Sequence, residues 1–302
     1  GLFARGDNAY TYDFDQGEML GNFYNYFPVR PQKAANVDGS YFAEGLGGNH
    51  ELKFGFGYRE TTTNTTTHYG GNQLIGVINS ADDKIARLHR DGNAGAVGKY
   101  VSFYAGDVFT KGRLSLNAGV RFDQQKAKNA AGEAPANASF PDRVPSVSYG
   151  GDSDYVIDWK DLSPRVGVSY AFGESRKTVA RASYARYANQ LQFKDVQLEN
   201  PVAPGFLAYA WNDRNGDRFV QPDEVLFDQY QYNYNIDPDN PGGAGQTPNR
   251  IDRDYGAAHT DEIVAGIDHE IVPNFAAGFA YTYRHISDLP YRPRLGGACG
   301  DP

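Results

Sequence analysis

One eleven-residue stretch, residues 113–123, constrains the fold most strongly, because its side chains alternate between apolar and polar. The even positions are all apolar: Leu114, Leu116, Ala118, Val120 and Phe122. Successive side chains of a β-strand point to opposite faces, so the stretch predicts a strand with one apolar and one polar face. At about 3.3 Å per residue it spans roughly 35 Å, enough to cross a bilayer at a tilt.

Other parts of the chain show similar alternation or strand-like composition. We predict further strands over residues 36–44, 50–61, 99–109, 163–172, 177–187, 262–272 and 275–284. The connections between these strands alternate between short turns and long loops, and the long loops cover approximately residues 62–96, 124–155 and 192–258. In an up-and-down antiparallel sheet, every short turn then lies at one end and every long loop at the other. Within the first loop, residues 82–89 are predicted to form a helical turn or two. Residues 1–31 are predicted to be loop with a short strand.

Segregation of the loops by length favours a membrane barrel over its main alternative, a soluble β-sandwich. Short turns at one end, long loops at the other and strands of about ten residues are typical of outer-membrane barrels. The sandwich fold does not require short and long loops to lie at opposite ends. The chain has no run of 18 apolar residues that would predict a transmembrane helix. The predicted fold is therefore all-β: an antiparallel up-and-down transmembrane β-barrel whose apolar face meets lipid.

The predicted strands are too few for loops of this size. About eight strands could close a small barrel, but small barrels rarely carry such long loops. The chain also begins without an initiator Met or a signal sequence and ends in a loop-like segment, residues 296–302. We therefore expect either an internal segment of a longer polypeptide or an incomplete part of a mature chain, which supplies about 8–10 strands of a larger barrel.

Composition argues against several functional classes. The net charge is −8 and there is no basic stripe, which argues against nucleic acid as a partner. Cys299 is the single cysteine, so no internal disulfide can form. No nucleophile motif or phosphate-binding loop is present, and we expect neither an enzyme nor an organic cofactor. The six histidines lie on separate predicted elements without the spacing of a helical metal pair, so they are interpreted as surface or lumen residues.

Residues 213–224 are the candidate metal site. The spacing matches positions 1, 3, 5, 7 and 12 of a calcium-binding loop, occupied here by Asp213, Asn215, Asp217, Phe219 (through its carbonyl) and Glu224. Position 6 is Arg218 where Gly is usual, and Pro222 disfavours a following helix. The alternative is an acidic turn in a surface loop. A bound Ca²⁺ would stiffen this loop and would have no catalytic role.

Two other groups of residues are candidates for ligand contact. The first is a set of arginines on the polar strand faces, which could bind anions or pair with acidic residues across strands: Arg121, Arg165, Arg181 and Arg284. The second is the tyrosine-rich run 230–234, which could stack on a sugar or a flat ligand, or pack the long loop onto itself.

Several predicted strands resemble those of TonB-dependent outer-membrane receptors. The resemblance is carried by residues 49–59 (NHELKFGFGYR), 104–109 (YAGDVF) with 112–123 (GRLSLNAGVRFD), and 163–170 (SPRVGVSY) with 183–187 (SYARY). It covers most of residues 36–290 and is closest to the Oar-like branch. It implies a barrel of about 22 strands, a plug domain and energised uptake through TonB. Neither a plug, a TonB-contacting box nor an aromatic C-terminal strand is present in this sequence.

The resemblance implies a receptor in the outer membrane of a Gram-negative cell. Its long loops would be extracellular and would bind a small-molecule, peptide or glycan ligand. The complete protein would import that ligand with energy from the TonB complex, through an N-terminal region outside this sequence. Outer-membrane lipid would cover the apolar strand faces. The alternative is a non-transporting scaffold or adhesin whose long loops bind other proteins.

Overall fold

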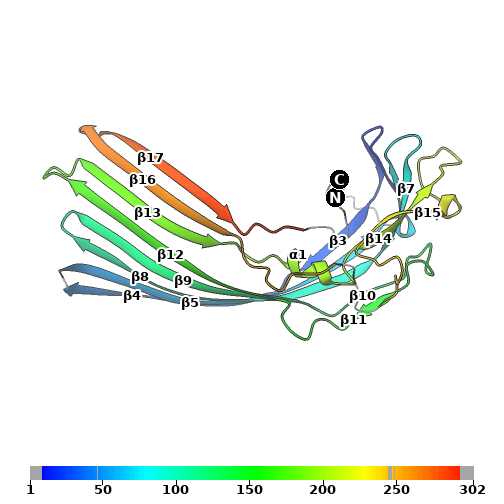
Figure 1. Cartoon of the computed structure of the whole chain (residues 1–302), viewed down its shortest axis with the longest axis horizontal. Helices are drawn as coiled ribbons and strands as arrows, with labels where there is room; N and C mark the ends of the chain where they lie inside the picture. Colours follow the sequence, from blue (N-terminus) through cyan, green and yellow to red (C-terminus); the bar gives the residue numbers. More distant parts are fainter. Residues whose placement is uncertain (1–8, 46, 244–246, 248, 293–302) are drawn as a thin grey trace.

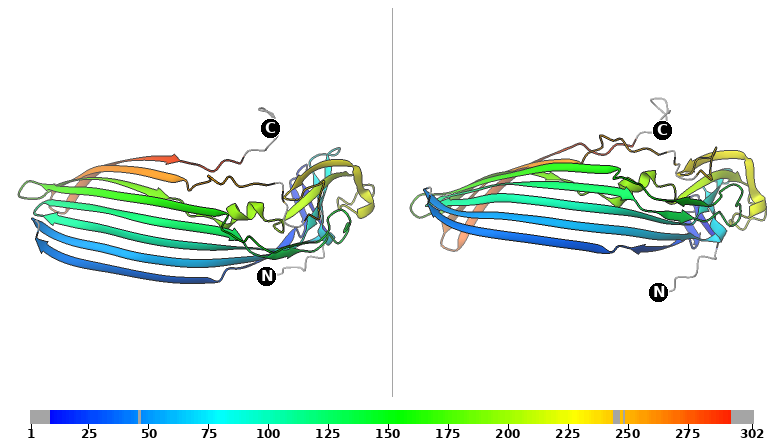
Figure 2. Two further views of the ribbon diagram at one scale, coloured as in Figure 1. Left: turned by 60° about the horizontal axis from the view of Figure 1, so that its bottom comes forward. Right: turned by 90° about the horizontal axis from the view of Figure 1, so that it is seen from below.

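The computed structural model describes residues 9–45, 47–243, 247 and 249–292 (Figure 1). A long, curved sheet forms most of the molecule, and a smaller sheet lies at one end of it (Figures 1 and 2). Among the described residues, no helix is long and apolar enough to cross a membrane. Cys299 and the loop-like segment 296–302 lie outside the described residues.

Eight long strands form the body of the large sheet, in the order β4-β5-β8-β9-β12-β13-β16-β17, and each is antiparallel to its neighbours. Their bounds are β4 (Gln32–Gly45), β5 (Gly48–Tyr69), β8 (Gly92–Lys111), β9 (Leu114–Asn129), β12 (Ile157–Phe172), β13 (Thr178–Ala188), β16 (His259–Val272) and β17 (Phe275–Ser287). Each overlaps one predicted strand, and the up-and-down arrangement is confirmed, although β5, β8, β9 and β12 are each several residues longer than predicted. In the described part of the chain β4 and β17 have one partner strand each. The sheet is therefore part of an unclosed barrel.

The short turns lie together at one end of this sheet, as predicted (Figure 1). They join β4 to β5, β8 to β9, β12 to β13, and β16 to β17. Gly112 and Asn274 take the left-handed conformation in two of these turns, with φ of 61° and 67°. Gly and Asn are the residues that reach this conformation most easily, which explains their places in the sequence.

The remaining elements lie near the other end. Three short strands complete the large sheet: β3 (Tyr24–Val29) pairs with β5, β10 (Gly132–Ala134) pairs with β8, and β11 (Val147–Tyr149) pairs with β10. The small sheet has the order β15-β14-β7-β6-β1-β2, formed by β1 (Tyr10–Asp13), β2 (Glu18–Gly21), β6 (Leu74–Ile78), β7 (Lys84–Arg90), β14 (Gly205–Trp211) and β15 (Val225–Tyr234). Four helical turns accompany them: η1 (Gly71–Gln73), α1 (Phe193–Val196), η2 (Gln197–Glu199) and η3 (Pro222–Glu224). We call the small sheet, together with the connecting segments that pack against it between β10 and β11, before β14 and after β15, the loop cap.

The three predicted long loops contain more regular structure than expected. The first begins inside a strand, because β5 continues to Tyr69, and it also holds β6 and β7. The second contains the end of β9 with β10 and β11, and the third contains α1, β14 and β15. The helical turn predicted over residues 82–89 is wrong, because residues 84–89 lie in β7. Ile85 and Leu88 have helical spacing but pack on opposite faces of the small sheet, in two different apolar clusters.

The large sheet has two chemically distinct faces. We call the face that bears Leu116 and Val166 the outer face, and the face that bears Arg121 the inner face. Leu116 is 38% exposed and Val166 54% exposed, although both are apolar. The buried apolar clusters lie in the loop cap and where the large sheet meets it, so no second sheet covers the outer face among the described residues. Apolar surface of this extent is not left in water, so lipid covers it.

Candidate functional site

The inner face carries a closed network of polar side chains midway along β8 and β9. Arg121 and Asp123 lie two residues apart on one strand and therefore share a face. Arg121 Nε donates to Asp123 Oδ1 at 2.9 Å, and Arg121 Nη2 donates to Tyr100 Oη at 2.7 Å. The Tyr100 hydroxyl also donates to the Asp123 carboxylate. Because each charge has a partner, this network can persist in a water-filled lumen without a ligand.

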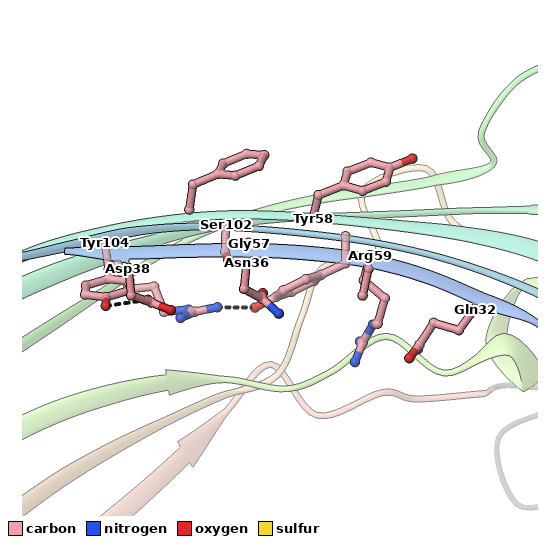
Figure 3. Close-up of a pocket in the computed structure, with 12 residues that line it drawn as sticks. Gln32, Asn36, Asp38, Gly57, Tyr58, Arg59, Ser102 and Tyr104 are labelled. Atoms are coloured by element: carbon pink, nitrogen blue, oxygen red, sulfur yellow. Dashed lines mark hydrogen bonds between the residues drawn. The ribbon is translucent and has the colours of Figure 1, made fainter.

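A hollow of about 300 Å³ lies beside this network, lined by side chains from β4, β5, β8 and β9. Figure 3 shows Asp38, Arg59 and Tyr104 on one side of the strands and Tyr58 on the other. Tyr104 donates to Asp38 at 2.7 Å. Arg59 stacks over Tyr100, with its Cζ 5.1 Å from the ring centroid, and makes no ion pair with any described residue. Its donors are thus available to an acceptor that enters the hollow.

The predicted arginine set is mostly paired. Arg121 pairs with Asp123 on its own strand, Arg181 with Asp268 across strands, and Arg284 with Glu262 across strands. Arg165 differs, because it stacks over the Tyr187 ring at 5.0 Å. The predicted ion pairing across strands is therefore confirmed for Arg181 and Arg284, whereas Arg121 pairs within its own strand. Arg59 could not be identified from the sequence, because it occupies a polar-face position of a predicted strand, as the paired arginines also do.

The loop cap carries an aromatic platform, which we define as Phe206, Tyr232 and Tyr234 together with Arg87. Arg87 donates to the Tyr232 hydroxyl from Nη2 at 2.7 Å and from Nε at 3.1 Å. The same guanidinium lies 4.8 Å from the Phe206 ring centroid. Phe206 and Tyr234 have centroids 6.0 Å apart, and the Tyr234 side chain is 55% exposed. Rings held rigidly beside a cation suit a ligand with a flat or ring-shaped face.

The tyrosine run 230–234 divides between its two predicted roles. It forms part of β15, and the Tyr232 hydroxyl is held by Arg87 inside the loop cap. Tyr230 and Tyr234 are exposed, and the Tyr230 hydroxyl donates to Asn233 at 2.8 Å. Tyr232 therefore packs within the loop cap, and Tyr230 and Tyr234 remain accessible to a ligand.

Arg90 holds the connections of the loop cap together from the inside. It is almost fully buried, and its guanidinium donates to the carbonyls of Pro201 at 2.8 Å, Pro241 at 3.3 Å and Pro145 at 3.4 Å. Burial lowers the pKa of Arg90 to about 10, which keeps it charged at neutral pH. Carbonyls from three separate connections thus converge on one cation, and this fixes the positions of those connections.

His89, the residue before Arg90, is buried on the opposite side of β7. Its ring stacks on Tyr69 with centroids 4.2 Å apart, and it contacts Phe206 of the aromatic platform. Burial, together with the nearby Arg87 charge, lowers the pKa of His89 to about 3. The imidazole is therefore neutral at physiological pH and packs as an aromatic ring.

The predicted calcium loop lies between β14 and β15. Asp213 accepts the backbone N–H of Gly216 at 2.9 Å and that of Arg218 at 3.3 Å. Arg218 has a φ of 65°, the left-handed conformation that Gly supplies at position 6 of such loops. Arg218 also pairs with Asp13 and Glu18 at 3.1 and 2.8 Å, which ties the loop to β1 and β2.

The carboxylates of this loop are engaged with the backbone. Asp217 accepts the N–H of Phe219 at 2.8 Å. Glu224 is buried and accepts the N–H groups of Arg214 at 2.9 Å and Gln221 at 3.1 Å, so it caps η3. Across the described residues, no three His, Cys, Asp or Glu side chains are grouped so that they could hold a metal ion. Calcium binding through Asp213, Asn215, Asp217, Phe219 and Glu224 stays a prediction.

Comparison with known proteins places the chain in a family. Residues 30–298 match the family described as outer membrane beta barrel domain. A structural neighbour is the ferric citrate transporter FecA in the unliganded form, with a TM-score of 0.40 and 12% sequence identity. The alignment covers 88% of this chain and 38% of that chain, so this chain spans well under half the length of the transporter. No curated protein matches the sequence. The family match extends over most of the chain, and the protein belongs to the outer membrane beta-barrel domain family.

Proposed function

We propose that this chain forms part of the wall and the loop cap of a TonB-dependent outer-membrane receptor of the Oar-like branch. The complete protein would bind a ligand through the cap and import it with TonB energy. The observation that carries this proposal is the unclosed sheet, whose outer face is apolar and whose inner face is polar, beneath a packed cap.

The two unpaired sheet edges support a barrel larger than these strands. At membrane depth every backbone N–H and C=O must be paired, so β4 and β17 each need a further partner strand. A barrel of about 22 strands, which the sequence resemblance implies, would supply both partners and a lumen wide enough for a plug. The plug and the TonB contact would lie in parts of the polypeptide outside this sequence.

The aromatic platform supports a ligand with ring-shaped or planar groups, such as a glycan or an aromatic peptide side chain. Tyr234 offers an exposed ring, and Arg87 a cation already held in place by Tyr232. Stacking on such rings adds about 0.5–1.5 kcal/mol per aromatic pair beyond simple burial. Below the cap, Arg59 offers free donors to a ligand that has entered the lumen.

The orientation of the loop cap is open to a direct test. In a Cys299→Ser background, Tyr234→Cys would place one thiol on the cap, and Gly112→Cys one thiol at the turn end. We expect a membrane-impermeant maleimide to label the first variant and not the second in intact cells. Labelling at residue 112 alone would reverse the orientation.

Import is tested with cells that carry the complete protein. The cells are given defined mixtures of glycans, peptides and iron chelates, and depletion of each compound from the medium is measured with and without TonB. We expect depletion of at least one compound that requires TonB and weakens in Tyr234→Ser, with Tyr170→Ser on the outer face as the control. Depletion that is equal without TonB would overturn the transport proposal.

A non-transporting adhesin or scaffold is the second candidate. It is favoured by the loop cap's own apolar core, in which Leu88, Leu207 and Trp211 are buried. Such a core gives the exposed surface a fixed shape without a ligand, as a protein-binding surface requires. TonB-independent binding of the complete protein to a host or bacterial surface, without depletion of any compound, would favour this candidate.

A further inference from the structure

The outer face has a ladder of charges at the point where its apolar surface ends. The ladder consists of residues directly opposite one another on five adjacent strands, from β4 to β12. We call it the basic ladder, and its members are Lys33, Glu60, Lys99, Lys126 and Asp158. Along β9, Val120 and Phe122 are the last apolar outer residues, and Gln124 and Lys126 follow towards the loop end.

Two lysines in this ladder face each other without an acid between them. Lys99 of β8 is directly opposite Lys126 of β9. Like charges directly opposite on one face destabilise a strand pair. Glu60 neutralises Lys99 only in part, because it is shared with Lys33 at 4.0 Å and lies 3.5 Å from Lys99. Lys126 pairs with Asp158 at 3.1 Å.

A third lysine joins them around one aromatic ring. The ammonium groups of Lys99, Lys126 and Lys128 lie 6.0, 5.8 and 5.6 Å from the Tyr155 ring centroid. Lys128 Nζ donates to the Ser153 carbonyl at 3.2 Å, which carries no charge, so Glu60 and Asp158 are the carboxylates that pair with these three lysines among the described residues. An anion with two negative charges, placed between Lys99 and Lys126, would relieve the repulsion.

The position of the ladder indicates which anion. Tyr58, which lies on the opposite side of β5 from Arg59 in Figure 3, is an outer-face residue, and its hydroxyl donates to Glu60 at 3.1 Å. Tyrosines at this level are typical of the membrane interface, and the apolar band lies immediately beside them. The lysines are therefore at the depth of lipid headgroups, and the side chains of Lys99 and Lys126 are partly exposed.

We propose that Lys99, Lys126 and Lys128 form a binding site for a phosphate-bearing lipid headgroup. Lysine is a common phosphate ligand, and basic clusters at a membrane interface attract anionic lipids. The choice of leaflet rests on the extracellular orientation proposed above, and the headgroup would then be that of a phosphorylated glycolipid in the outer leaflet. The phosphate chemistry is independent of that orientation and of ligand import.

The test uses the complete protein in a neutral detergent and measures binding of diphosphorylated lipid A by native mass spectrometry. Dephosphorylated lipid A and inorganic phosphate are the comparison probes. We expect the Lys99→Gln/Lys126→Gln double variant to bind the phosphorylated lipid roughly 30-fold more weakly, at about 1 kcal/mol for each lysine. Lys111→Gln, at the turn end of the same strand, is the matched control and should bind as the wild type does.

Three results would overturn this proposal. The first is that the double variant binds the phosphorylated lipid as tightly as the wild type does. The second is that the dephosphorylated lipid binds as tightly as the phosphorylated lipid. The third is that inorganic phosphate displaces the lipid at matched concentration, which would indicate a site for a free anion. Should the double variant fail to fold, Lys99→Arg/Lys126→Arg preserves the charges and is expected to retain binding. Binding in detergent involves neither TonB nor the transported ligand, so its failure would leave the receptor proposal intact.

Discussion

Arg121 and Phe122 are consecutive residues of β9, and their side chains lie on opposite faces of the large sheet. Arg121 donates to Asp123 and Tyr100 on the inner face. Phe122 is directly opposite Phe103 and Leu162 on the outer face, where these two rings and one aliphatic side chain are 36%, 51% and 60% exposed. One step along the chain therefore crosses from a charged network to a surface suited to hydrocarbon.

The first prediction concerns the assignment of these faces. Leu116→Arg places a charge on the outer face near mid-depth and should cost about 2–4 kcal/mol of stability in the membrane. Ser115→Arg, one residue away on the inner face, should be tolerated far better. Unfolding of the complete protein from lipid vesicles by urea measures both. Equal losses from the two substitutions would contradict the assignment.

The second prediction concerns Arg90. Arg90→Ala leaves the carbonyls of Pro145, Pro201 and Pro241 without their donor, and each buried unsatisfied acceptor costs about 1–3 kcal/mol. The loop cap should therefore open locally while the large sheet stays intact. Hydrogen exchange should become faster in β7 and β14 and stay unchanged in β9 and β12. Exposed Arg143, which stacks on Phe227, provides the control substitution Arg143→Ala.

The third prediction concerns pH. The pKa of His89 is about 3 in the folded cap against about 6.5 when unfolded. Between these values the unfolded chain binds a proton that the folded cap does not. The contribution of His89 is therefore full above about pH 6.5 and falls by about 1.4 kcal/mol per pH unit as the solution is acidified towards pH 3. In His89→Phe the stability of the cap should no longer fall by this amount between about pH 6.5 and pH 3. In His68→Gln the fall should remain. Thermal unfolding of the cap as a function of pH decides between them.

The fourth prediction concerns the loop between β14 and β15. If it holds Ca²⁺, Glu224→Gln should weaken calcium binding measured by calorimetry, because position 12 normally supplies two of the oxygen ligands. The control is Asp228→Asn, an exposed residue of β15 outside the loop. Since Glu224 also caps η3, the circular dichroism of the variant should be compared with that of the wild type. No heat of binding in the wild type would remove the calcium proposal.

Most of the eight long strands could be predicted from the sequence because their two faces differ in polarity, as in β9, whereas residues 99–109 of β8 are apolar on both faces and were predicted from their strand-like composition. The extension of β5 to Tyr69 could not, since residues 61–67 are almost all threonine and therefore polar on both faces. β6 was missed for the opposite reason, because Leu74–Ile78 is apolar and buried on both faces and so shows no alternation. Alternation identifies strands that have lipid on one face and water on the other, and neither the end of β5 nor β6 lies in such surroundings.

The contacts that organise the loop cap depend on residues far apart in the chain. Arg90 meets Pro241, and Arg87 meets Tyr232, across about half of the sequence. No local pattern distinguishes Arg87 or Arg90 from other basic residues. The tyrosine run was visible in the sequence, but the cation beside it was not, because its position is set by the pairing of β7 with β14.

Lipid is expected to cover the outer face of the large sheet. Spin labels on single cysteines, in a Cys299→Ser background of the complete protein in lipid vesicles, test it most directly. Labels at residues 116, 118 and 120 should be accessible to oxygen and shielded from a water-soluble nickel chelate, and labels at 115, 117 and 119 should show the reverse. Shielding of residues 116, 118 and 120 from both reagents would mean that protein covers this face, and would contradict the claim.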